Sequence, residues 1–113
     1  MYLISPAFLW RVNSGAVKAN DDNAAVRVYG VRRNTENGFE EAEDITSNCS
    51  ITQARLDDIT GLHYFRVHYQ ENIVFNQYVV VLYNSTNATE HIVLSKKVAP
   101  VDRSQNVIYM DLG

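Results

Sequence analysis

The sequence has a single cysteine, so the chain cannot close a disulfide bond within itself. A fold of 113 residues without such a bond must rest on its apolar core and on the hydrogen bonds between its elements. Only two prolines and five glycines occur, against seven tyrosines, four phenylalanines and one tryptophan. This composition favours extended strands and excludes a low-complexity or wholly disordered chain.

Long apolar runs and clusters of basic residues are also missing. No apolar run approaches the roughly 18 residues that a membrane-spanning helix needs. The formal charge of −3 argues against a surface that binds phosphate. The apolar start of the chain lacks a basic segment and a small-residue cleavage site, so we predict no signal peptide. We therefore expect no nucleic acid and no membrane among the partners.

Two runs rich in β-branched and aromatic residues, 62–69 and 77–83, dominate the middle of the sequence. The first run alternates, which puts Phe65, Val67 and Tyr69 on one face of a strand. The second is apolar on both faces, as expected for a central strand covered on both sides. We predict that these runs are the core strands of a β-sandwich and lie side by side as neighbours.

Further segments with strand composition are separated by turn signals, and no amphipathic pattern of helix length appears. We expect strands at residues 7–13, 24–31, 39–46, 49–56 and 90–99. Asn37-Gly38 predicts a hairpin turn, because both residues tolerate positive φ. Gly30, inside a strand, predicts a β-bulge. The acidic segment 39–46 predicts an exposed edge strand whose charges prevent edge-to-edge pairing.

These patterns predict one all-β domain, residues 1–113: an antiparallel β-sandwich of about seven to eight strands. Residues 1–6 are an N-terminal arm, residues 7–99 the sandwich, and residues 100–113 a C-terminal strand or arm. The N-terminal arm either packs on its own domain or reaches a neighbouring subunit. The C-terminal segment either adds a strand to the same domain or detaches and joins another sheet.

No constellation of catalytic or metal-ligating residues emerges from the sequence. His63 and His68 fall on opposite faces of one strand, and the motifs H-x-H, H-E-x-x-H and C-x-x-C are absent. Cys49 is interpreted as a buried, inert thiol. Residues 19–23 are interpreted as a turn, because the spacing of a calcium loop is missing. We predict no catalytic, metal or cofactor-binding residues, and a chain that is not an enzyme.

The segments LDDITGLHYFRV, residues 56–67, and NQYVVVLY, residues 76–83, resemble a recurrent arrangement in Ig-like β-sandwich domains. Tyr78, at the start of its strand, stands where the tyrosine of a tyrosine corner falls in that fold. The chain is also similar to small, cysteine-poor Ig-like accessory proteins of tailed-bacteriophage virions. That resemblance implies an Ig-like sandwich with terminal arms and carries no catalytic residue.

The resemblance further implies a non-enzymatic virion structural or accessory protein, such as a capsid decoration, neck or tail component. Such a protein assembles in the host cytoplasm with other virion proteins and as a homo-oligomer. We expect contacts through a sheet face and the terminal arms. The candidate contact residues are Tyr2, Leu3, Phe8, Trp10, Tyr64, Val107, Ile108, Tyr109 and Met110.

The alternative is a carbohydrate- or receptor-binding module. It would use the loops at residues 70–76 and 84–89, with Tyr64 or Tyr83 as a platform on which a sugar ring stacks. The two hypotheses differ in the partner, a protein assembly or a glycan, and in whether the chain acts as an oligomer or as a monomer.

Overall fold

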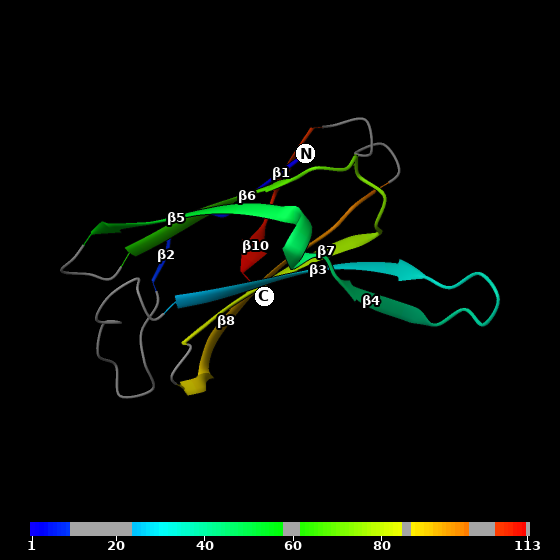
Figure 1. Cartoon of the computed structure of the whole chain (residues 1–113), viewed down its shortest axis with the longest axis horizontal. Helices are drawn as coiled ribbons and strands as arrows, with labels where there is room; N and C mark the ends of the chain where they lie inside the picture. Colours follow the sequence, from blue (N-terminus) through cyan, green and yellow to red (C-terminus); the bar gives the residue numbers. More distant parts are fainter. Residues whose placement is uncertain (10–23, 58–61, 85–86, 100–105, 113) are drawn as a thin grey trace.

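The computed structural model describes residues 1–9, 24–57, 62–84, 87–99 and 106–112, which form two facing β-sheets (Figure 1). The elements are β1 (Tyr2–Ile4), β2 (Phe8–Leu9), β3 (Ala24–Arg33), β4 (Glu40–Asp44), the 3-10 helix η1 (Thr46–Asn48), β5 (Cys49–Asp57), β6 (Leu62–Tyr69), β7 (Gln77–Asn84), β8 (Asn87–Lys97), β9 (Val107–Tyr109) and β10 (Asp111–Leu112). The prediction of an all-β sandwich is confirmed.

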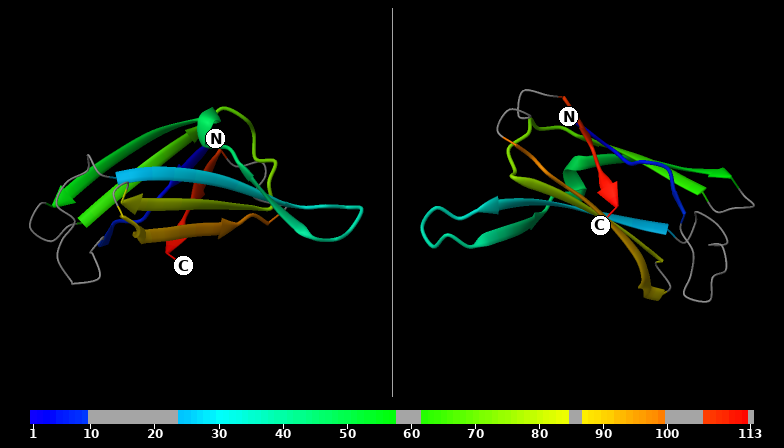
Figure 2. Two further views of the ribbon diagram at one scale, coloured as in Figure 1. Left: turned by 60° about the horizontal axis from the view of Figure 1, so that its bottom comes forward. Right: turned by 180° about the vertical axis from the view of Figure 1, so that it is seen from behind.

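The first sheet is built around β6, with β5 on one side and β1 and β2 on the other. β1 is antiparallel to β6 and parallel to β9, so strands from the two ends of the chain lie side by side. The second sheet has the order β10-β8-β7-β3-β4 and is antiparallel throughout. The chain therefore leaves the first sheet at β9 and joins the second at β10, which links the two sheets along one side (Figure 2).

The two central runs form β6 and β7 as predicted, but the prediction that they are neighbouring strands is wrong. β6 belongs to the first sheet and β7 to the second, and residues 70–76 cross between them. The runs instead meet across the core, where Phe65 and Val67 of β6 and Val80 of β7 are all 0% exposed. β7 is central in its sheet, yet its outward residues are only half-buried, so it is not covered on both sides.

The acidic segment forms the edge strand that its charges predict. Every residue of β4 is exposed, and the strand ends the sheet next to β3. The turn before it contains Gly38 at a φ of 74°, the left-handed conformation that glycine adopts without steric cost. β3 and β4 therefore form the predicted hairpin.

Both terminal segments belong to the fold of the chain itself. Leu3 is 0% exposed in β1, and Ser5 Oγ accepts the N–H of Phe65 at 2.8 Å. Of the two interpretations of residues 1–6, the structure has the strand that packs on its own domain, and β9 is likewise a strand of that domain. Four candidate contact residues are thus corrected to core residues, because their side chains point between the sheets: Leu3, Phe8, Ile108 and Met110.

The crossing from β6 to β7 is fixed by Tyr78, which is 0% exposed. Its hydroxyl accepts the backbone N–H of Val74 at 3.3 Å, the type of hydrogen bond that a tyrosine corner makes to the backbone just upstream. The ring packs edge-on against Phe75, with centroids 5.6 Å apart and an interplanar angle of 84°. Ile73 and Phe75 are buried, so this connection is anchored in the core.

We expect Tyr78→Phe to lower the free energy of unfolding by about 1–2 kcal/mol, because the Val74 N–H loses its partner while the ring stays packed. Urea unfolding at pH 7 measures the change, and the denaturant slope should stay constant. Tyr64→Phe, at a half-buried position, is the matched control and should shift stability by less than about 0.5 kcal/mol. Equal losses in the two variants would show that the hydrogen bond between Val74 and Tyr78 contributes nothing.

Candidate interaction surface

Those candidate contact residues that the structure describes outside the core lie on one face. Tyr2 of β1, Tyr64 of β6, and Val107 and Tyr109 of β9 all lie on the side of the first sheet that points away from the second. They do so because alternate residues of a strand share a face, and the residues between them are buried. With their neighbours they form the outer tyrosine face, which consists of Tyr2, Ile4, Tyr64, Arg66, His68, Val107 and Tyr109.

The strand register arranges most of this face in two rows across β6, β1 and β9. One row is His68, Tyr2 and Val107, and the other is Arg66, Ile4 and Tyr109. With strands about 4.8 Å apart and rows about 7 Å apart, the Cα atoms of these rows span roughly 10 by 7 Å. A standard protein interface covers about 800 Å² on each partner, so these two rows of Cα atoms span only a small part of such an interface.

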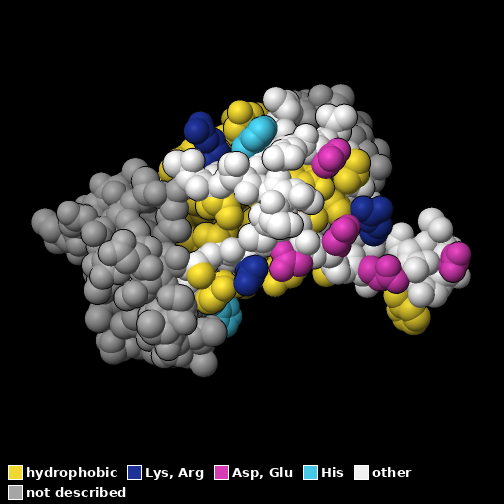
Figure 3. Space-filling model, viewed as in Figure 1, with side chains coloured by type: hydrophobic (Ala, Val, Ile, Leu, Met, Phe, Trp, Pro, Cys, Tyr) yellow, Lys and Arg dark blue, Asp and Glu magenta, His cyan; other side chains and the backbone are white. Residues whose placement is uncertain are grey.

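The rings and charges of this face are close together. The Tyr2 ring lies 4.7 Å from that of His68, and the Arg66 guanidinium lies 5.7 Å from the centre of the Tyr2 ring, within cation–π range. Tyr109 is 69% exposed. Figure 3 shows hydrophobic, basic and histidine side chains together along the upper margin, where Figure 1 labels β1 and β6. Tyrosine and arginine are the residues that dominate binding energy at protein interfaces.

Other predicted features do not join this face. Tyr83 points outward from the second sheet, so Tyr64 and Tyr83 lie on opposite sides of the sandwich and cannot form one platform. Trp10 and the side chains of residues 84–90 lie outside the described residues. Sequence reasoning missed Arg66 and His68 as members of the face, although their alternation with Phe65 and Val67 already placed them beside Tyr64.

The outer face of the second sheet has a shallow hollow, which is lined by Arg27, Tyr29, Val81, Tyr83 and His91. A hydrogen bond with the Tyr83 side chain, together with the nearby Tyr83 and Asp44 charges, raises the pKa of the Arg27 guanidinium. The Arg27 guanidinium also lies 4.0 Å from the Asp44 carboxylate, with both side chains about half exposed, so this pair contributes little to stability.

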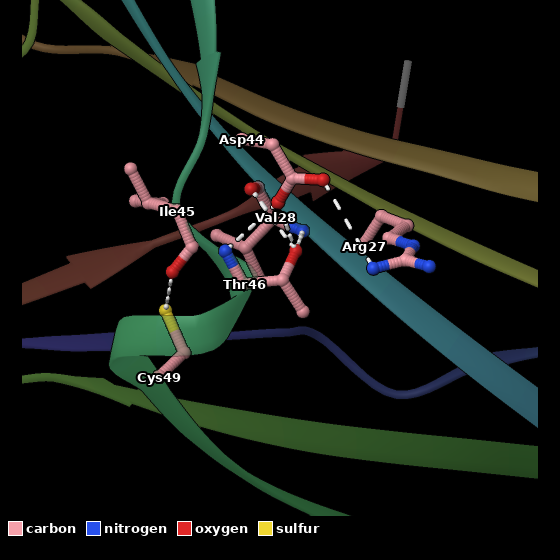
Figure 4. A network of polar contacts seen from close by, with 6 residues as sticks. All are labelled: Arg27, Val28, Asp44, Ile45, Thr46 and Cys49. Carbon is pink, nitrogen blue, oxygen red and sulfur yellow. Dashed lines mark hydrogen bonds and ion pairs between the residues drawn. The ribbon is translucent and has the colours of Figure 1, made fainter.

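Asp44 anchors the end of β4 to β3 (Figure 4). Its carboxylate accepts the N–H of Thr46 at 2.9 Å and lies 2.6 Å from the Thr46 hydroxyl. That hydroxyl also accepts the N–H of Val28 in β3 at 2.8 Å. The hydrogen bonds from the side chain and backbone of Thr46, and then the charge of Arg27, lower the pKa of Asp44.

Asp44→Asn should destabilise the fold at pH 7 by less than about 1 kcal/mol, because the carboxylate is exposed and screened. A carboxyl group with a lowered folded-state pKa stabilises above its unfolded pKa of about 3.9, and this stability is lost as the pH falls through the lower folded pKa. The difference between wild type and variant should therefore shrink across that acidic window in thermal unfolding curves. Thr46→Val should remove most of the same pH dependence, and additive effects of the two changes would contradict the shared network.

Cys49 lies in the same corner of the fold and is half-buried (Figure 4). Its thiol donates to the carbonyl oxygen of Ile45, with a sulfur–oxygen distance of 3.3 Å. Burial, and then the charge of Asp44, raises the pKa of Cys49 to about 11. The thiol is protonated at neutral pH and is a poor nucleophile there.

Within the described ranges, no group of three or more His, Cys, Asp or Glu side chains could hold a metal ion. No helix in that part of the chain is long and apolar enough to cross a membrane. Comparisons of the chain with protein-family models, with curated proteins and with solved structures found no match. Function must therefore be inferred from the fold and the surface of the chain itself.

Proposed function

We propose that the chain is a non-enzymatic structural protein of a virion, a capsid decoration, neck or tail component that stabilises an assembly through its outer tyrosine face. The observation that carries this proposal is that Tyr2, Tyr64 and Tyr109 lie on one face of the first sheet, where Arg66 lies over the Tyr2 ring. Aromatic and arginine side chains are enriched in interface cores. The resemblance of residues 56–67 and 76–83 to Ig-like virion accessory proteins supports the virion assignment.

An Ig-like identity of the sandwich belongs to the proposal. In Ig-like domains the strands C′, C, F and G are neighbours in one sheet, and D pairs with E in the other. In chain order, β3 to β8 have the pairings of C, C′, D, E, F and G. The Tyr78 hydrogen bond at the crossing from β6 to β7 is a second supporting feature. The parallel strand β9 beside β1 departs from the Ig arrangement, in which strand A takes that place.

The terminal strands contribute to this contact through their outward side chains. β1 is paired on both sides, so it offers Tyr2 but no free backbone edge. β9 pairs only with β1 among the described strands, and its other edge can accept a strand from a neighbouring subunit. We propose contacts of this kind, and not the exchange of whole arms.

Cryo-electron microscopy of particles from cells that make the chain tests the proposal. The outer tyrosine face should pack against another particle protein. Tyr2→Ser combined with Tyr64→Ser should reduce the occupancy of the chain on particles at least about tenfold, because two aromatic anchors are lost. The matched control is Tyr29→Ser with Tyr83→Ser on the second sheet, which should leave occupancy unchanged. Particles that lack the chain, or a face open to solvent, would refute the proposal.

A carbohydrate-binding module is the second candidate, and the same three tyrosines favour it, because aromatic rings on a flat sheet stack on sugars. Binding on a glycan array by a monomeric protein, abolished by Tyr64→Ala, would select this function. A particle-bound chain without glycan binding would select the structural role.

A further inference from the structure

The β3–β4 hairpin projects beyond the sandwich as a two-stranded ribbon (Figures 1 and 2). β3 pairs with β7 only as far as Val31, and its last two residues pair with β4 alone. Two-stranded ribbons are marginally stable in water, and apolar side chains on them are not shielded. Phe39, at the turn of this ribbon, is nevertheless 71% exposed. A single exposed apolar side chain is common on protein surfaces, so a contact through Phe39 depends on what this side chain could fit and not on its exposure alone.

The turn holds Phe39 in a defined position. Asn34 donates its backbone N–H to the Phe39 carbonyl and accepts the N–H of Gly38 at its own carbonyl, both at 2.8 Å. The Asn34 side-chain amide donates to Glu41 at 2.9 Å, and Arg33 Nε donates to the Gly38 carbonyl at 3.1 Å. A turn whose backbone is already ordered loses less entropy when it binds.

An open hollow of about 390 Å³ lies where β8, β9 and β10 meet. Val98, Val107 and Ile108 are among its lining residues, although Val98 and Ile108 are almost fully buried, and two lysines lie beside them. Tyr109 lines the same hollow and is 69% exposed. The described residues that line it are Lys96, Lys97, Val98, Val107, Ile108, Tyr109 and Asp111.

The hollow and the hairpin carry opposite charges. Lys96 pairs with Asp111 at 3.2 Å, whereas Lys97 is exposed and makes no ion pair with another described residue. The described residues of the lining therefore have a net charge of +1, from two lysines and one aspartate. Residues 32–43 of the hairpin contain four glutamates and two arginines, a net charge of −2. Glu40 and Glu41 directly follow Phe39.

The two features lie at opposite edges of one sheet, whose order is β10-β8-β7-β3-β4. Four strand spacings of about 4.8 Å put about 19 Å between β4 and β10, so the hairpin does not reach the hollow of its own chain. We infer that Phe39 of one copy enters the hollow between β8 and β9 of a second copy, with its glutamates facing Lys97. This inference rests on the proposed structural role and names a second copy of the chain as a partner. Such a head-to-tail contact closes into a ring or extends as a filament.

Sedimentation equilibrium of the purified chain over a concentration series tests this contact. The mass of the wild type should rise above the 12.8 kDa monomer as concentration increases. Phe39→Ser in the hairpin and Lys97→Glu in the hollow should each weaken association at least about tenfold. Val74→Ser removes a different exposed apolar side chain and should associate like the wild type. A wild type that stays monomeric up to about 1 mM, or a Phe39→Ser variant that associates normally, would overturn the inference.

Mixing the two variants is the sharper test. The Phe39→Ser chain keeps an intact hollow and the Lys97→Glu chain an intact hairpin, so an equimolar mixture has one productive contact. It should form a dimer and stop there. A mixture that stays as dissociated as its components would show that Phe39 does not bind the hollow.

If Phe39→Ser impairs folding, exchanging the charges of Glu40 and Lys97 tests the same contact without changing Phe39. Glu40→Lys and Lys97→Glu should each weaken association, and the two changes together in one chain should restore it. Failure of the double variant to associate would contradict the contact.

The experiments distinguish failure of the head-to-tail contact from failure of the virion role. If the Phe39→Ser variant no longer self-associates but still occupies particles, both proposals stand. If this variant self-associates normally, only the head-to-tail contact is refuted. If the chain is absent from particles, only the virion role is refuted.

Discussion

Gly30→Val is expected to lower the free energy of unfolding by more than about 3 kcal/mol. Gly30 is buried in β3, and a Cβ atom at this position would overlap the ring of Phe75. That ring is 1% exposed and cannot withdraw, because the Tyr78 ring packs against it and the Arg32 guanidinium lies 4.6 Å from its centre. Domains of this size have only about 5–15 kcal/mol of stability in total.

Urea unfolding followed by circular dichroism measures this effect. Ala42→Val adds similar bulk on the exposed strand β4 and should change stability by less than about 0.5 kcal/mol. Phe75→Ala is itself destabilising, but combined with Gly30→Val it should cost at least about 1 kcal/mol less than the sum of the two changes, because the overlap is gone. A Gly30→Val variant as stable as the wild type would refute the close packing.

Gly30 also shows what local sequence patterns do not contain. The prediction of a bulge at this glycine is wrong, since the register to both β4 and β7 runs through Gly30 without a shift. The glycine is required by a ring from the crossing after β6, far along the chain. Nothing in the alternation of residues 24–31 reports that contact, because the contact exists only once the two sheets have met.

The same reasoning separates the predictable and unpredictable parts of the fold. Alternation predicted β6 with its observed bounds and its buried face, because period-two burial is a local property of a strand. It did not predict that β6 and β7 lie in different sheets or that β1 runs parallel to β9. Pairing depends on which buried faces oppose each other, and several arrangements satisfy one pattern.

The interaction surface was predictable to a similar extent. The sequence predicts Tyr2, Tyr64 and Tyr109 as contact residues, and the structure brings them onto one face. The sequence also predicts Leu3 and Ile108 as contact residues, but both lie in the core. An apolar residue in a terminal strand has the same pattern whether it packs inward or against a partner, so only the observed register distinguishes the two.

Leu3→Ala is expected to cost about 3–5 kcal/mol, because a fully buried side chain leaves a cavity between the sheets. β1 is also the strand that joins β6 to β9, so loosening it weakens two pairings. Ile4→Ala, at the next position but on the half-buried outer face, is the matched control and should cost less than half as much. Similar losses at both positions would contradict the inward packing of Leu3.

The same variant decides between an internal strand and an exchanged arm. Because β1 packs on its own chain, the thermal midpoint of the Phe39→Ser variant, which lacks the proposed hairpin contact, should not depend on protein concentration, and adding Leu3→Ala should lower it by the same amount at every concentration. A strand donated by a neighbour would make folding bimolecular, and the midpoint would rise with concentration. The midpoints with and without Leu3→Ala are both measured in the Phe39→Ser background, which removes the proposed hairpin contact. A midpoint that still rises with concentration would indicate exchange of the N-terminal strand.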